Sequence, residues 1–506
     1  MSLKRLLKLL ASFLMGQGVT VLSQLLIPPL FLLRYAHGIE VYGEWITLTA
    51  AISYLNTLNY GIQNYANNQM AIHYHREEID EAKIVQASAL RLIIYAVSLL
   101  ALAGSAVLFM PIDRILSLRH ISSHEASLTI FLMILQLLLG WPFALISNSY
   151  MVIGEAHRGQ SWMNGQRLAA LLTMSALLWF RASFPLLALT QAASVTLFLL
   201  LVIVDVRMRA PLLVPSLRYG NMKSMMAIMR PSGYFGLLAV SSFLCWQGPV
   251  LIIQKVLGPA SVAIFQITRV VFNMSRQIMI VLTFSISQDI TILVGQKNWE
   301  RLHRLYDLSE RVVLLLVPTV TVGTLLMCPV LFTIWLHKRT LYQPGLCLLM
   351  AAISGVMGIK EHKYQFQSSS NEHQSLSRFS IAAYFIMLVA AAFLLRPFGI
   401  RSLLLLWLAT EVVQLIYILR LNAKLFPKEA QVSMTPVVHL AFVLTGSLAL
   451  AVWPAYHSAQ WPLFEVAAVA TGFTAVLGVF SYFAFKLGEV RKVLEGRLRR
   501  RFAIPR

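Results

Sequence analysis

The sequence predicts an all-α integral membrane protein with about 14 transmembrane helices. Hydrophobic residues make up 58% of the 506 residues and charged residues only 12%, about half the charged share of a soluble domain. Mostly apolar runs of roughly 18 to 25 residues recur from end to end, which is the length that crosses about 30 Å of hydrocarbon as a helix. The period-two alternation of a membrane β-barrel is missing. The chain is therefore predicted to consist mainly of helices.

The apolar runs place the spans in order along the chain. Basic residues precede the first run, but it is too long for a signal peptide and has no clear small-x-small cleavage site, so it is predicted to stay as a span. The predicted spans are residues 9–33, 44–71, 88–110, 124–153, 163–180, 184–206, 232–257, 260–292, 310–336, 344–366, 378–396, 400–421, 436–456 and 463–486.

The placement of basic residues predicts the orientation. An even span count puts both termini on one side, and most of the 42 Lys and Arg residues lie in the terminal segments and in the loops after even-numbered spans. By the positive-inside rule both termini are cytoplasmic. Membrane orientation therefore explains the excess of basic residues, and binding of nucleic acid is not needed to explain it. The basic tail is expected to contact the phospholipid bilayer.

A constant shift of 220 residues superposes features of the first third on the middle third. Gly16 falls on Gly236 and Pro29 on Pro249, and further pairs follow at Gly38/Gly258, Asp80/Glu300 and Arg91/Arg311. The shift predicts two six-helix lobes related by pseudo-twofold symmetry, with the substrate site between them. The expected parts are an N-lobe (1–206), a cytoplasmic linker (207–231), a C-lobe (232–422), two additional helices (436–486) and a basic cytoplasmic tail (487–506).

Charged residues inside spans are costly in a bilayer and normally face a cavity. In the eighth span, Gln266, Arg269, Asn273 and Arg276 recur at i, i+3, i+7 and i+10, which places both guanidinium groups on one helical face. The nearest acid in that span, Asp289, is about 20 Å further along the helix. The face is therefore expected to meet water, an acid from elsewhere or an anionic ligand.

The second span carries uncharged amides on one face, at Asn56, Asn59, Gln63 and Asn67. Amides can line a polar cavity for sugar hydroxyls or bond a neighbouring helix, and the sequence leaves both alternatives open.

Two further cations lie near predicted span ends. Arg34 and Lys255 either rim a central cavity or extend to the outer interface, and Arg34 coincides with Gln254 under the shift.

Acids are scarce in the spans. Lys360, Glu361 and Lys363 are interpreted as a hydrated inner end of the tenth span. Glu411, near the middle of the twelfth span, has no cation within one turn, and such an isolated acid is a candidate ion-coupling residue.

Enzyme motifs are missing from the sequence. The three cysteines, Cys245, Cys328 and Cys347, are in apolar surroundings without metal-ligand spacing. P-loop, G-x-S-x-G and H-E-x-x-H motifs do not occur. We expect no catalytic residues, no metal, no cofactor and no ATP hydrolysis on this chain.

Residues 16–68 carry a family pattern. A glycine-bearing first span, a short turn, YGEW (Tyr42 to Trp45) and a polar LNYG segment (Leu58 to Gly61) follow one another there. This order resembles the Wzx-type polysaccharide flippases of the multidrug/oligosaccharidyl-lipid/polysaccharide (MOP) exporter superfamily, and the layout of two halves plus two helices extends the likeness over the whole chain.

The resemblance implies alternating access of a polyprenyl-diphosphate-linked oligosaccharide across the bacterial inner membrane, for O-antigen or other surface polysaccharide. It implies a cationic cavity matched by Arg269 and Arg276, with Arg34 and Lys255 as weaker candidates, and polysaccharide polymerase or assembly proteins as partners. The chain departs from the family in having no arginine deep in its first two spans, so the phosphate site rests on the second half.

Two other functions stay open. A cation-coupled drug exporter of the same superfamily would hold cationic drugs with carboxylates, which are scarce in these spans. A membrane enzyme acting on lipid-linked sugars would need a large outer loop with catalytic groups, and no predicted outer loop is large.

Overall fold

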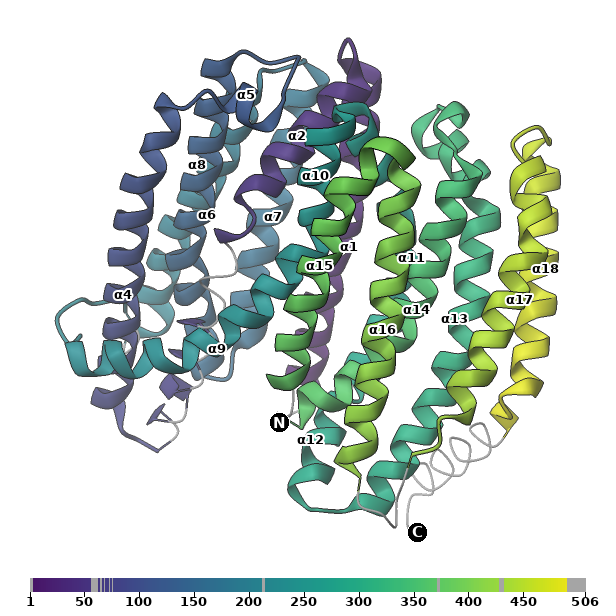
Figure 1. Cartoon of the computed structure of the whole chain (residues 1–506). Coiled ribbons are helices and arrows are strands. Elements are labelled where there is room, and N and C mark those ends of the chain that lie inside the picture. Colours follow the sequence, from purple (N-terminus) through teal and green to yellow (C-terminus); the bar gives the residue numbers. More distant parts are fainter. Residues whose placement is uncertain are drawn as a thin grey trace. The chain divides into compact units, whose positions relative to one another are not determined.

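The computed structural model describes residues 3–55, 62–63, 66–67, 69–71, 73–74, 76–211, 214–370, 374–426 and 432–488. Helices are the only extended regular elements in these ranges (Figure 1), which confirms the predicted all-α class. Eleven of the described helices are long and apolar enough to cross a membrane. The protein is therefore a multi-pass membrane protein.

Three of the predicted spans are not among these eleven. Two of them correspond to long helices, α7 (Ala156–Trp179) and α11 (Pro259–Ser285), whose polar residues lower their hydropathy. The third, 44–71, starts inside α2 (Gly38–Ile52) and continues into residues that are only partly described. The count of 14 spans stays a prediction.

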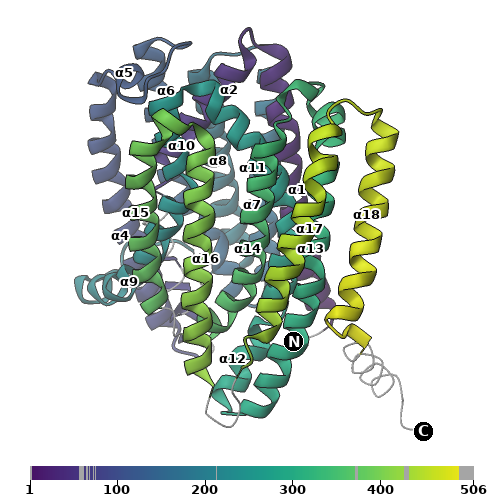
Figure 2. The same cartoon turned by 45° about the vertical axis from the view of Figure 1, so that its right-hand side comes forward.

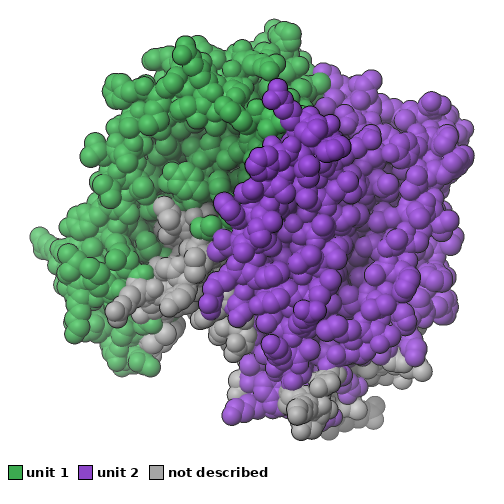
Figure 3. All heavy atoms as spheres, viewed as in Figure 1, with its two compact units in different colours: residues 1–263 green, residues 264–506 purple. Residues whose placement is uncertain are grey.

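The helices divide into two compact units, Met1–Ala263 and Ile264–Arg506, coloured separately in Figure 3. Elements wholly in the first unit, besides α2 and α7, are α1 (Leu3–Arg34), α4 (Ile79–Ser105), η1 (Ala106–Phe109), α5 (Ile112–Leu116), α6 (Ser123–Val152), α8 (Phe184–Arg209), α9 (Met222–Trp246) and α10 (Gly248–Leu257).

The second unit holds most of α11 and all later elements. These are α12 (Ser287–Gly295), α13 (Trp299–Leu336), η3 (Arg339–Leu341), α14 (Pro344–Ser369), α15 (Gln374–Phe398), α16 (Ile400–Leu425), α17 (Thr435–His457) and α18 (Leu463–Ala484). Figures 1 and 2 both show α17 and α18 at the yellow edge of this unit, and both helices pack on α13.

Local signals in the sequence set several helix ends. Ser122 and Glu125 form a reciprocal capping box at the start of α6. Asn298 accepts the backbone N–H of Arg301 and caps α13. Gly399, with φ at 67°, separates α15 from α16, because glycine adopts this left-handed region without a steric cost.

Helix starts repeat along the chain as the 220-residue shift predicts. The first residues of α11, α13 and α14 follow those of α2, α4 and α6 by 221, 220 and 221 residues. The two halves of the chain therefore carry the same order of helices.

The first compact unit, which ends at Ala263, includes the α10 helix. The α10 helix packs on α2, where the Thr47 hydroxyl donates to the Gln254 amide oxygen at 3.1 Å. A Cβ atom on Gly43 would lie 1.9 Å from the Pro259 carbonyl oxygen, so the backbones meet closely there. These contacts attach α9 and α10 to the first unit.

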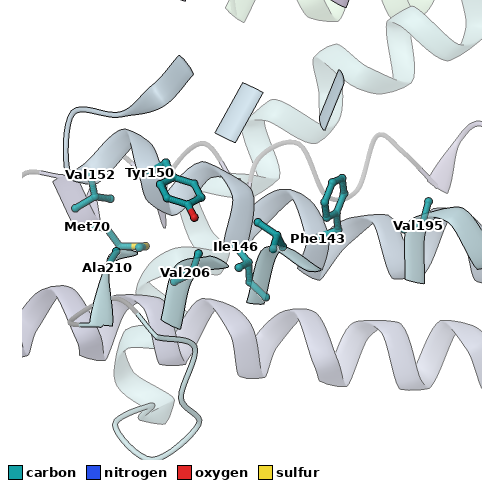
Figure 4. Packing of buried hydrophobic residues seen from close by; sticks show 9 residues of the cluster. Met70, Phe143, Ile146, Tyr150, Val152, Val195, Val206 and Ala210 are labelled. Carbon is teal, nitrogen blue, oxygen red and sulfur yellow. The ribbon is translucent and has the colours of Figure 1, made fainter. Parts of the chain in front are cut away.

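The core of the first unit lies between α6 and α8. Figure 4 shows its apolar side chains in one layer, and the cluster comprises Met70, Phe143, Ile146, Tyr150, Val152, Val195, Val202, Val206 and Ala210. Within a bilayer such side chains stabilise the helix pair by close van der Waals packing, because lipid tails are as apolar as the side chains. This layer fixes α8 against α6.

Asp205 on α8 gathers polar groups from two other helices beside this layer. Its carboxylate accepts the Tyr150 hydroxyl from α6 and, from α7, the Trp162 indole N–H at 2.8 Å. The Arg158 guanidinium donates to both carboxylate oxygens, at 2.8 and 2.5 Å. A fully bonded buried carboxylate thus connects α6, α7 and α8.

We predict that Asp205→Asn lowers the stability of the full-length protein by about 3 kcal/mol, because Arg158 loses its counter-charge in a partly buried place. Tyr150→Phe removes one hydrogen bond and should cost only about 1 kcal/mol. Thermal unfolding of the detergent-purified variants tests this order. Equal midpoints for both variants would show that the carboxylate does not hold the three helices.

Candidate functional site

The strongest polar feature of the second unit is a run of four titratable residues on α14, Lys360, Glu361, His362 and Lys363. Successive helical residues point about 100° apart, so four in a row face all sides of the helix. Each side chain has a partner on another helix: Lys360 on α15 and α16, Glu361 on α11, and the last two on α13. α14 is therefore the central helix of this charge cluster.

The part of the cluster that faces α13 is buried from solvent. The Lys363 ammonium pairs with the Glu310 carboxylate, and their side chains are 0% and 3% exposed. The same ammonium lies 4.1 Å from the centre of the Tyr306 ring. His362 shares a 2.8 Å hydrogen bond with the Ser309 hydroxyl, next to Glu310 in the chain.

The expected hydrated inner end at Lys360, Glu361 and Lys363 is therefore wrong for Lys363. The physical reason is helix length, since α14 continues to Ser369 and α13 starts at Trp299, well before Glu310. Both helices extend beyond Lys363 and Glu310 and shield these two side chains from solvent.

Towards α16, Lys360 of α14 pairs with Glu411. The Glu411 side chain is 0% exposed, and its carboxylate also accepts the Tyr384 hydroxyl at 2.7 Å and the Trp407 indole N–H at 3.0 Å. The expectation that Glu411 is an isolated acid is corrected, because the cation comes from another helix. A role in ion coupling stays a prediction.

The two arginines of the basic stripe on α11 lie on a buried face of the helix. Arg269 and Arg276 are both almost fully buried. The Arg276 guanidinium donates to the Glu361 carboxylate at 2.7 Å, so the acid that α11 lacks is supplied by α14. Arg269 donates to the Gln266 amide oxygen and lies 5.1 Å from the Phe265 ring.

The remaining member of the stripe, Asn273, is half-buried on the same helix. The α11 stripe and the α14 charge cluster are joined by the Arg276–Glu361 pair. Four cations, Arg269, Arg276, Lys360 and Lys363, stand against three carboxylates, Glu310, Glu361 and Glu411, in this described region. These seven charged side chains come from α11, α13, α14 and α16.

The two weaker cation candidates lie in the first unit at helix ends. Arg34 donates from Nε to the Trp179 carbonyl oxygen at 3.0 Å, and its guanidinium lies 4.1 Å from that indole ring. Burial raises the pKa of the neighbouring Tyr35 to about 12. Lys255 is exposed, and its Nζ lies 3.5 Å from the Ile115 carbonyl oxygen. These contacts favour the interfacial alternative for both cations.

Only part of the amide stripe can be placed. Asn56 and Asn59 lie outside the described residues. Gln63 donates to the Trp141 carbonyl oxygen of α6 at 3.2 Å, which is a bond between helices. Asn67 is buried, and its amide oxygen has no hydrogen-bond donor among the described residues. Gln63 thus favours the helix-bonding alternative.

Sequence reasoning missed Glu310, Tyr384 and Gln414 as members of the site. A helical-wheel reading of GIKEHK was the available signal, because four adjacent titratable residues in an apolar helix require polar partners on several neighbouring helices. The identity of those partners depends on tertiary packing.

No family model matches the sequence, and no curated protein sequence matches it. Solved structures do match. The lipid II flippase MurJ in an inward closed conformation is similar with a TM-score of 0.67 and 11% identity, over 95% of this chain and 100% of that chain. An inward-facing multidrug resistance MATE family transporter of the MOP superfamily has a TM-score of 0.60 and 13% identity, covering 81% and 95%. The MATE multidrug transporter DinF-BH, solved as a complex, has a TM-score of 0.61 and 14% identity, covering 83% and 95%.

The three structural matches differ in the share of this chain that they cover. The match to the lipid II flippase leaves 5% of the 506 residues, or about 25, outside it. Helices α17 and α18 together hold more residues than that, so at least part of this pair is matched. The likeness supports, at the level of fold, the superfamily resemblance of residues 16–68. The chain therefore has the fold of the lipid II flippase and of MATE transporters of the MOP superfamily.

Proposed function

We propose that the protein is a flippase that moves a polyprenyl-diphosphate-linked oligosaccharide across the bacterial inner membrane by alternating access. The observation that carries the proposal is the pair of buried arginines on one face of α11, of which Arg276 pairs with the partly exposed Glu361 of α14. A diphosphate is multiply negative and cannot cross hydrocarbon alone. Arginine guanidinium groups bind phosphate oxygens with two parallel hydrogen bonds.

The spacing of the two arginines fits a moving ligand. Arg269 and Arg276 are seven residues apart, which is about 10 Å along the helix and almost the same angular position. A diphosphate can thus pass from one guanidinium to the other while its prenyl tail stays in lipid. Gln266 and Asn273 share the face and offer amide groups to the ligand's sugars.

The membrane setting of the proposal follows from the predicted orientation. We infer cytoplasmic termini, lobes at 1–206 and 232–422, and polysaccharide assembly proteins as partners, in line with the basic inner loops and the family resemblance.

Glu361 is predicted to act as a competitor of the anionic ligand. Its carboxylate is 29% exposed and covers Arg276, which is 8% exposed, so an arriving anion has to displace it. In Glu361→Gln, inorganic pyrophosphate should inhibit lipid movement at about tenfold lower concentration, equivalent to about 1.4 kcal/mol. Asp307→Asn, which removes the partly exposed partner of Arg311, is the matched control and should leave inhibition unchanged. An unaltered inhibition curve for Glu361→Gln would exclude this competition.

A cation-coupled drug exporter is the second candidate, favoured by the fold likeness to MATE transporters. The test compares two cargoes in liposomes containing the full-length protein: a fluorescent polyprenyl-diphosphate oligosaccharide and a cationic rhodamine dye. Movement of the lipid-linked sugar alone supports the flippase. Movement of the dye alone, lost in Glu411→Gln, would establish the exporter.

A further inference from the structure

The Lys360 ammonium lies among oxygen atoms of two other helices. Its Nζ is 3.0 Å from the Tyr384 hydroxyl oxygen of α15 and 3.5 Å from the Gln414 amide oxygen of α16, and it contacts a carboxylate oxygen of Glu411. Its side chain is only 14% exposed. Carboxylate, phenol and amide oxygens are the ligands that hard metal cations select.

The oxygen shell is held in place without Lys360. The second Glu411 oxygen accepts the Tyr384 hydroxyl and the Trp407 indole N–H, which fix the carboxylate from both sides. Glu411 and Gln414 are three residues apart on α16, so both side chains face α14 together. Three groups on two helices thus form a site of fixed shape.

The Gln414 amide is oriented with its oxygen inward. This oxygen accepts the Ser380 hydroxyl at 2.9 Å and lies 3.5 Å from the Lys360 ammonium nitrogen. The amide nitrogen is buried without an acceptor among the residues that the structure describes. In this orientation Gln414 presents an oxygen acceptor to both the Ser380 hydroxyl and the positive charge of Lys360.

We propose that Lys360 is a built-in cation, whose ammonium occupies an oxygen site that otherwise takes a monovalent metal ion such as Na⁺. The shell carries a single negative charge, on Glu411, which one ammonium or one monovalent ion balances. A divalent ion would leave an excess charge in a dry place. The ammonium consequently takes the place of a bound metal ion beside Glu411, and this holds whichever cargo the protein carries.

The test uses the full-length protein in detergent, with NaCl replaced stepwise by choline chloride at constant ionic strength. The thermal-unfolding midpoint of the unaltered protein is expected not to depend on Na⁺. Lys360→Met removes the ammonium group and keeps most of the side-chain length. The thermal-unfolding midpoint of this variant should rise by about 2–4 °C, in a saturable manner, as the Na⁺ concentration goes from zero to about 150 mM. Lys360→Arg keeps the charge and should not respond.

The double variant Lys360→Met/Glu411→Gln removes both charges and serves as the control, which should fold and ignore Na⁺. A Lys360→Met variant that responds to neither Na⁺, Li⁺ nor K⁺ would overturn the proposal, and so would an equal Na⁺ response in the unaltered protein. If Lys360→Met is recovered only when purified in NaCl, that result supports the proposal. Aggregation of Lys360→Met in both salts, with a folded double variant, contradicts it.

Discussion

Replacing Lys363 by methionine should lower the thermal-unfolding midpoint of the full-length protein more than the loss of Arg276. The variant leaves the Glu310 carboxylate, 3% exposed, without its counter-charge between α13 and α14. Breaking a buried ion pair on one side typically costs about 3–5 kcal/mol. Arg276 has a partner that is 29% exposed and can be hydrated, so its loss should cost less.

The double variant Lys363→Met/Glu310→Met distinguishes the effect of the ion pair from the effect of the volume that the two side chains fill. Apolar groups of similar volume often replace a buried ion pair without loss of stability. We expect the double variant to regain most of the midpoint that Lys363→Met loses. A double variant less stable than the single one would mean that the two charges do not act as a pair.

The second large effect is expected on transport at Arg276. Arg276→Gln should reduce the initial rate of lipid-linked sugar movement at least tenfold, because the amide cannot hold a phosphate by charge-assisted hydrogen bonds. Arg276→Lys should keep an intermediate rate, since an ammonium supplies charge but not the planar pair of donors. Initial rates in liposomes and unfolding midpoints are measured on the same preparations.

The separation of rate from stability decides the role of Arg276. A loss of rate at a nearly unchanged midpoint indicates a ligand-binding residue. Parallel loss of both quantities in Arg276→Gln and Arg276→Lys would make the Arg276–Glu361 pair a structural contact between α11 and α14.

Much of the fold could be predicted from the sequence, because span length and hydropathy are properties of short segments. The 220-residue shift anticipated the repeated helix starts for the same reason. A helix is present where the span at 260–292 is predicted, but the polar face of this helix, α11, keeps it out of the strongly apolar helices, and its role as a span stays a prediction.

The partners of the buried charges could not be predicted from spacing along one helix. Glu411 looked isolated because its cation, Lys360, is 51 residues away in the chain and arrives on α14. Lys363 looked hydrated because the predicted tenth span ended at 366, whereas the helix continues to Ser369 under cover of α13. Ion pairs between helices are decided by tertiary packing, which hydropathy does not report.

The measurement that tests the central claim most directly is transbilayer movement of a fluorescent polyprenyl-diphosphate oligosaccharide in liposomes. It compares the full-length protein with Arg269→Ala/Arg276→Ala and with Arg396→Ala, which removes the same side chain from the exposed last turn of α15. The account predicts movement by the unaltered protein and by Arg396→Ala, and less than about one tenth of that rate for the double variant. Unchanged movement by a correctly inserted double variant would contradict the assignment of α11 as the diphosphate-binding helix.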